Sequence, residues 1–154
     1  HRILLVDGNL ADPSVHQTFG LSQEPGLLNY LTGEMDLQQV VQPTMRPNLE
    51  VITIGKPAAQ VLSPFDLLKF STFLEETQTS YDFVLFDSAP ILGSSDSLTI
   101  ATKVDGIILV AEANHTRYET IISIESYLQD SAKVMGIVLN KRRFVIPKAL
   151  YNIV

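Results

Sequence analysis

The sequence predicts an α/β fold, with a doubly wound, mostly parallel sheet and helices on both faces. Two observations support this prediction. Five short apolar runs are continuous and do not alternate with polar residues, which is typical of strands buried on both faces of a sheet. Stretches with helical spacing lie between the runs, so strands and helices alternate. At 154 residues the chain has the size of one domain, and we expect residues 1–154 to form a single domain.

The expected strands are rich in valine, isoleucine and leucine, which suit the pleated, buried surface of a sheet. The first strand is followed by a turn-prone segment at residues 7–13, the second by Gly55 and the third by Asp87. In chain order the five strands are Ile3–Val6, Val51–Ile54, Phe83–Phe86, Gly106–Val110 and Val134–Leu139.

Five segments between these strands are predicted to be helical. Ser63 and Pro64 form a cap followed by proline at the first helical position, and apolar residues continue at helical spacing as far as Leu74. The serine-rich segment at residues 94–97 is expected to cap a further helix. The other expected helices are residues 26–31, 36–42 and 117–130.

The charge balance limits the kinds of partner. Seventeen acidic residues against 11 basic ones give a net charge of −6, which argues against a nucleic-acid-binding face. The absence of cysteine excludes disulfides and thiolate metal sites. Because no apolar run is long enough to span a bilayer and the first residues do not form a signal peptide, we expect a cytoplasmic domain.

Polar residues follow three of the strands, where ligands bind in open α/β sheets. Asp7 closes the first strand, Asp87 the third and Asn140 the last, with Lys141–Arg143 directly after it. An acid after four apolar strand residues is the Walker B arrangement, in which the carboxylate holds a phosphate-bound Mg²⁺. The simpler alternative is that each acid only ends its strand or caps the next helix.

A phospho-accepting receiver domain is a second alternative, because that fold also has acids at strand ends. Asp7 and Asp87 are 80 positions apart, which is nearly double the separation such receivers show, and the expected acidic pair at the first strand is a single Asp7 followed by Gly8 and Asn9.

An ordered series of motifs resembles the kinase domain of the bacterial tyrosine kinases of capsule and exopolysaccharide synthesis, which are deviant-Walker P-loop ATPases. The resemblance runs from about Ile3 to Asn140. It comprises the strand ending in Val6–Asn9, the turn at residues 55–57, the Walker B region Tyr81–Pro90, Asp96, Val104–Gly106 and Gly136–Asn140.

The resemblance implies an ATP·Mg²⁺ site in which Asp7 and Asp87 hold the metal and act in catalysis, with Asn140 and Arg142 near the base. It also implies transfer of the γ-phosphoryl group to tyrosines of a neighbouring subunit in a homo-oligomeric ring. Of the tyrosines here, Tyr151 is the one that resembles such an acceptor. The implied partner is a membrane polysaccharide co-polymerase, or chain-length regulator, which would hold the domain at the inner face of the membrane.

The sequence departs from the family pattern at the phosphate-binding elements. It contains no Gly-x-x-x-x-Gly-Lys-[Ser/Thr] segment, Asn9 stands where the family has a second acid, and Ala11 stands where it has arginine. An amide is a weaker Mg²⁺ ligand than a carboxylate and cannot act as a base. We therefore expect a catalytically degenerate domain with a regulatory or scaffolding role. The alternative is an active kinase whose P-loop lies outside this sequence.

Overall fold

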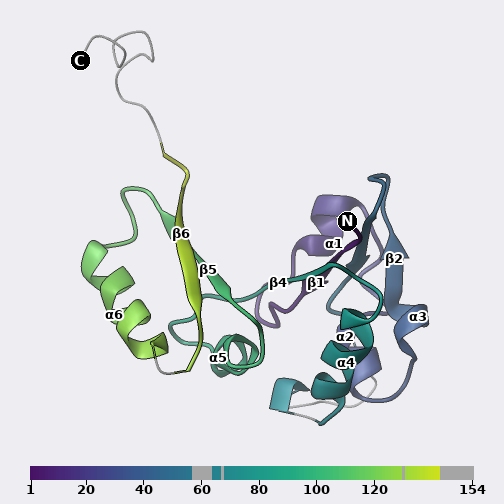
Figure 1. Ribbon diagram of the computed structural model, residues 1–154. Helices are drawn as coiled ribbons and strands as arrows, with labels where there is room; N and C mark the ends of the chain where they lie inside the picture. The colour runs from purple at the N-terminus through teal and green to yellow at the C-terminus, as the bar shows by residue number, and fades with distance from the viewer. Residues whose placement is uncertain (57–63, 67, 130, 143–154) are drawn as a thin grey trace, which may run out of the picture. The chain divides into compact units, whose positions relative to one another are not determined.

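The computed structural model describes residues 1–56, 64–66, 68–129 and 131–142 (Figure 1). The chain divides into two compact units, residues 1–100 and 101–154, and each unit contains its own sheet. The predicted α/β class with a mostly parallel sheet is confirmed, whereas the expectation of one domain over the whole chain stays a prediction.

The first unit is built on a four-stranded sheet in the order β2-β3-β1-β4. β1 (Ile3–Asp7) runs parallel to both β3 (Leu49–Ile52) and β4 (Phe83–Asp87). β2 (Val41–Pro43) is antiparallel to β3. The three parallel strands therefore bring their carboxyl ends to the same edge of the sheet.

Helices accompany both faces of this sheet. On one face, Phe86 of β4 contacts two buried phenylalanines, Phe70 and Phe73, of α4 (Leu68–Gln78) in edge-to-face pairs. On the other face, Leu5 lines a small pocket with residues of α1 (Val15–Phe19). The remaining helical elements of this unit are α2 (Leu27–Leu31), α3 (Leu37–Val40), the 3₁₀ turn η1 (Pro64–Asp66) and α5 (Ser95–Ala101), which ends at the boundary of the unit.

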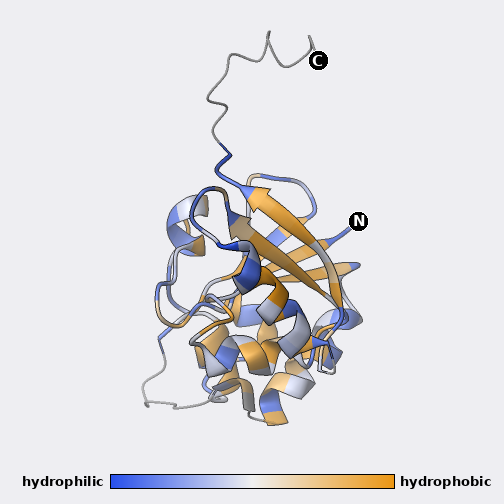
Figure 2. Ribbon diagram, turned by 90° about the vertical axis from the view of Figure 1, so that its left-hand side faces the viewer, coloured by the Kyte–Doolittle hydropathy of each residue, from blue (hydrophilic) through white to orange (hydrophobic). Residues whose placement is uncertain are grey.

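The second unit has a parallel pair of strands joined by a helix. β5 (Ile107–Glu112) leads through α6 (Tyr118–Leu128) to β6 (Val134–Asn140), and the strands pair from Ile107↔Val134 to Glu112↔Asn140. These strands are apolar along most of their length (Figure 2), yet several of their side chains are exposed, including Val110 and Leu139. The arrangement is a β-α-β unit, as parallel pairing requires.

Two predicted elements differ from those observed, and one observed helix was not predicted. Residues 36–42 were expected to be one helix, but α3 ends at Val40 and residues 41–43 form β2. The strand expected at residues 51–54 begins and ends two residues earlier, because Leu49 and Glu50 already pair with β1. α1 was not predicted. The Ser63 cap lies outside the described residues, as does Tyr151.

A close approach between the backbones of Gly26 and Gly55 fixes the start of α2. The amides of Leu27 and Leu28 donate to the carbonyl oxygens of Thr53 and Ile54, at 2.8 and 2.9 Å. These bonds satisfy N–H groups that a helix start leaves unpaired. A Cβ on Gly26 would collide with the backbone of residues 53–55, so only glycine fits at this position.

Candidate functional site

Asp7 and Asp87 are neighbours at the carboxyl edge of the first sheet. They are the last residues of two adjacent parallel strands and are paired directly in register. The amide of Gly8 donates to the carbonyl oxygen of Asp87 at 2.8 Å, which continues the pairing beyond β1. The two acids therefore lie side by side at this edge, and their role in holding a metal stays a prediction.

The Asp7 side chain is completely buried and accepts two backbone hydrogen bonds. Its Oδ1 accepts from the amide of Asn9 and its Oδ2 from the amide of Val15, both at 3.2 Å. Val15 is the first residue of α1, and Ser14 before it makes no side-chain cap. Asp7 therefore caps the start of α1. This is the structural role that the simpler alternative gives to an acid at the end of a strand.

Loss of hydration is the main effect on the pKa of both acids. Loss of hydration raises the pKa of Asp7 above its usual range, against the two backbone amides that lower it, and the nearby charge of Asp87 raises it further. Asp87 is exposed at the surface, but partial loss of hydration also raises its pKa. Because the two carboxylates repel each other, a bound cation would stabilise their ionised forms.

The side chain of Asn9 makes a hydrogen bond within its own loop. Its Oδ1 accepts a hydrogen bond from the amide of Asp12 at 3.1 Å, which closes the turn between β1 and α1. In this arrangement the Asn9 oxygen is committed to the backbone of its own loop. Asn9 therefore stabilises the loop through this hydrogen bond. Unlike an acid, it offers no carboxylate.

His16 is a neighbour of the site that the sequence analysis did not place there. It follows Val15 in α1, and its charge acts on Asp7. Its Nδ1 is buried without a hydrogen-bond partner among the described residues. No local sequence pattern indicates that position 16 lies near position 7, because their proximity depends on how the intervening loop folds.

One small cavity is lined by Asp87, and another by residues that follow the two acids in the chain. The first, of about 340 Å³, is lined by Asp87 together with Leu5, Val15 and Phe19. The second, of about 320 Å³, is lined by Ala11 and by residues of the segment after β4. In that segment the Ser94 hydroxyl accepts from the amide of Ser97 at 3.2 Å and so caps α5, as predicted.

Asn140 and Arg142 lie in the second unit. Asn140 is the last residue of β6, and its Oδ1 accepts from the amide of Lys141 at 2.8 Å. Lys141 in turn forms an ion pair with Glu112 at 3.0 Å. Arg142 follows as an exposed residue. The role of Asn140 and Arg142 near a nucleotide base stays a prediction.

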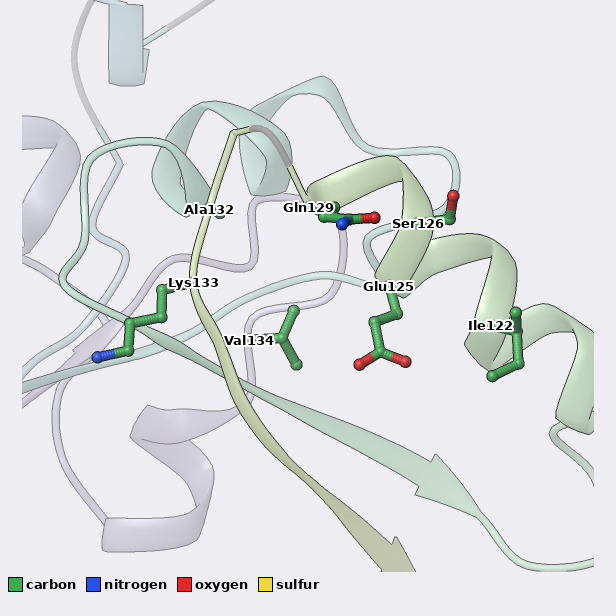
Figure 3. Close-up of a pocket in the computed structure, with 7 residues that line it drawn as sticks. All are labelled: Ile122, Glu125, Ser126, Gln129, Ala132, Lys133 and Val134. Atoms are coloured by element: carbon green, nitrogen blue, oxygen red, sulfur yellow. The ribbon is translucent and has the colours of Figure 1, made fainter.

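A further pocket, of about 480 Å³, lies in the second unit between α6 and the start of β6. Figure 3 shows Ile122 and Glu125 reaching into it from the helix, with Val134 on the strand side. It contains none of the predicted site residues.

Two carboxylates fit the chemistry of a magnesium ion that is shared with phosphates. Mg²⁺ keeps several water ligands and takes one or two protein carboxylates plus phosphate oxygens. Within the part of the chain that the structure describes, no group of three histidine or acidic side chains forms a metal cluster. Asp7 and Asp87 therefore suit a metal that a phosphate-bearing ligand helps to bind, and not a metal held by protein alone.

The fold and the paired strand-end acids define a P-loop NTPase-like α/β domain, and comparison with solved structures agrees. The cell-division ATPase MinD of Pyrococcus furiosus, at 19% identity, superimposes with a TM-score of 0.72 over 99% of this chain and 66% of that chain. At this identity the likeness concerns the fold.

Closer relatives are protein kinases. The VpsO kinase domain is 33% identical, with a TM-score of 0.83, over 92% of this chain and 71% of that chain. The tyrosine-protein kinases ptk of Acinetobacter johnsonii and YwqD of Bacillus subtilis are each 30% identical, over 90% and 92% of this chain. The chain belongs to the bacterial tyrosine-protein kinase family, which sets aside the receiver alternative.

The matched region is only part of these relatives. The chain spans 19% of the length of ptk and 60% of that of YwqD. No protein-family model matches the sequence. No helix among the described residues has the length and apolar character to cross a bilayer.

Proposed function

We propose that this chain carries the metal-binding acids of an ATP·Mg²⁺ site in a protein-tyrosine kinase domain of capsule or exopolysaccharide synthesis. The observation that supports this most directly is the in-register pairing of Asp7 and Asp87 at the ends of adjacent parallel strands. Ligands bind at this edge in open α/β sheets. The kinase family of the chain supplies the reaction class, which is transfer of the γ-phosphoryl group to a tyrosine hydroxyl.

The two acids would have unequal roles. The amides of Asn9 and Val15 hold the buried Asp7 carboxylate in one orientation, so its position is fixed before a ligand arrives. Asp87 is exposed and can meet a ligand that arrives from solvent. When bound, Mg²⁺ would neutralise charge on the β- and γ-phosphates.

Calorimetric titration of the purified protein with ATP and MgCl₂ tests this proposal. We expect Asp87→Ala to abolish binding of the ATP·Mg²⁺ complex, because the exposed metal ligand is removed. Glu75→Ala, which deletes an exposed acid of α4 away from the site, is the matched control and should bind as the wild type does. Equal affinity of wild type and Asp87→Ala would refute the site.

A second candidate function is a regulatory or scaffolding domain with little turnover, and Asn9 favours it. Its amide replaces the acid of the resembled motif, and its oxygen is engaged by the amide of Asp12. Phosphoryl transfer depends on positioned charge, so this substitution should weaken catalysis more than nucleotide binding.

Restoring the acid distinguishes the two candidates. If the domain is degenerate, Asn9→Asp should raise autophosphorylation at least tenfold over the wild type, as measured by phosphotyrosine formation with ATP and MgCl₂. If the wild type already autophosphorylates and Asn9→Asp does not raise the rate, the active-kinase candidate is favoured. In both cases the proposed partner is a membrane polysaccharide co-polymerase that holds the domain at the inner face of the membrane, and co-purification with that partner would test this.

A further inference from the structure

Helix α5 contacts the chain just after each of the two strand-end acids. Ser97 is 2% exposed, and its hydroxyl donates to the carbonyl oxygen of Ala89, two residues after Asp87, at 2.8 Å. Ile100 is 4% exposed. It lies so close to Gly8, the residue after β1, that a Cβ there would come within 3.2 Å of the Ile100 Cδ1 atom. Ser97 and Ile100 are three residues apart and therefore share one face of the helix.

The segment that carries Asp87 is held at two points. The carbonyl oxygen of Asp87 accepts from the amide of Gly8 at 2.8 Å, and that of Ala89 accepts from the Ser97 hydroxyl. The hydroxyl of Ser88 also donates to Ala89, at 3.3 Å, but Ser88 is the chain neighbour of Ala89, so this bond does not tie the segment to another element. The backbone around the exposed Asp87 is thus fixed by the chain after β1 and by α5.

Ser97 lies behind the wall of the cavity at this edge of the sheet. The cavity of about 320 Å³ is lined by Ala89 and Ser94 but not by Ser97. These are the two residues to which the Ser97 hydroxyl bonds, since it also shares a hydrogen bond of 3.1 Å with the Ser94 hydroxyl. The hydroxyl of Ser97 is therefore satisfied within the protein and is not left for a ligand, so it can act on the site only through the position of its neighbours.

We propose that Ser97 is a positioning residue for the ATP·Mg²⁺ site, an inference that rests on the proposed function. Its hydrogen bond to Ala89 holds in place the segment from which Asp87 reaches the metal. Fixing a mobile segment when a ligand binds costs conformational entropy, and groups that orient a metal ligand without touching the metal raise its affinity for this reason. Loss of the Ser97 hydroxyl would free the segment and weaken binding of ATP and Mg²⁺ together.

Calorimetric titration of the purified protein with ATP and MgCl₂ tests this inference. We expect Ser97→Ala to weaken binding about three- to tenfold, the effect of one typical hydrogen bond. Thr77→Ala is the matched control, because it deletes a buried hydroxyl of α4 that also donates to a carbonyl oxygen at 2.8 Å. This control should lower the melting temperature at least as much and bind ATP·Mg²⁺ as the wild type does. Equal weakening by the two variants would overturn the proposal, because it would show a general loss of stability.

The Asp87→Ala variant in the same titration separates this inference from the proposed function. If Asp87→Ala abolishes binding while Ser97→Ala binds as the wild type does, the metal site stands and the role of Ser97 is overturned. If Asp87→Ala binds as the wild type does, the site itself is refuted, and Ser97 has no metal ligand to position.

NMR relaxation of the Ser88 and Ala89 backbone amides tests the positioning without any ligand. We expect Ser97→Ala to lower their order parameters from about 0.85, typical of a rigid backbone, toward about 0.6. Ser94→Ala removes the cap of α5 but keeps the bond from Ser97 to Ala89, so it should leave them unchanged. Unchanged order parameters in Ser97→Ala, or an equal decrease in both variants, would overturn the proposal.

Discussion

The carboxylate of Asp7 is buried, bound by two backbone amides and repelled by Asp87. Its pKa in the folded protein lies above the unfolded value of 3.8, so the folded state holds this proton more tightly than the unfolded chain does. The free energy of unfolding therefore falls as pH rises from about 3.8 through the folded pKa, and this contribution is constant at higher pH.

Asp87→Asn should reduce this pH dependence. It removes the repulsion that Asp87 exerts on Asp7, so the pKa of Asp7 should fall and the free energy of unfolding at pH 7 should rise. Because Asp87 is exposed, solvent screens the effect, and we expect a gain of about 0.5 kcal/mol.

Urea denaturation between pH 3 and pH 7 in the presence of EDTA measures this effect, with Glu75→Gln as control. A loss of stability in Asp87→Asn at pH 7 would show that Asp87 makes a stabilising contact that outweighs the repulsion.

At the scale of helices and strands, the start of α2 depends on the absence of a side chain at Gly26. Gly26→Ala should lower the free energy of unfolding by about 2–3 kcal/mol, the upper part of the range for overpacked sites, because the new methyl group meets the backbone of residues 53–55. Gly136→Ala is the control, since the space around that glycine of β6 is open. Thermal denaturation of both variants measures the change in melting temperature. An equal decrease in the two would contradict the close approach seen at Gly26.

The elements that the sequence predicted well are those whose pattern is local. The expected strands at residues 3–6, 83–86, 106–110 and 134–139 agree with β1, β4, β5 and β6 to within about two residues at either end, because continuous aliphatic runs of this length have few alternatives. β3 begins earlier than expected because Glu50, a charged residue, is accommodated at its start. There Glu50 accepts a hydrogen bond from the Tyr81 hydroxyl at 2.7 Å.

The elements that were missed depend on distant partners. Residues 41–43 have helical spacing with the preceding segment, yet they pair with β3 in an antiparallel strand. α1 has only five residues, and its start is capped by Asp7, eight positions before Val15. The pairing of Asp7 with Asp87 was predictable from strand ends, whereas the placement of His16 beside Asp7 was not, because it depends on the fold of the loop between them.

At the scale of the whole molecule, the two units differ in how well their sheets are supported. In the first unit, β1 is bordered by strands on both sides and contributes buried residues such as Leu4 and Val6. In the second, the pair β5-β6 exposes many of its apolar side chains. Two-stranded sheets have little stability of their own.

Native-state hydrogen exchange should therefore separate the two units. We expect the amides of β1 to exchange at least tenfold more slowly than those of β5 and β6, because opening free energies follow local burial. Mass spectrometry of peptides that cover residues 3–7 and 107–112 measures the ratio. Equal protection in the two peptides would indicate one cooperative unit.

If Asp7 holds the proposed Mg²⁺, the cap that it provides to α1 would link ion binding to the order of that helix. A cation at this carboxylate withdraws electron density from the oxygens that accept from Asn9 and Val15, so it weakens the bonds that hold the first turn. By thermodynamic linkage, whatever stabilises that turn must in return change the affinity for the ion. A fluorophore attached at Gln17, which is exposed on α1, would thus report on the occupancy of a site that it does not touch.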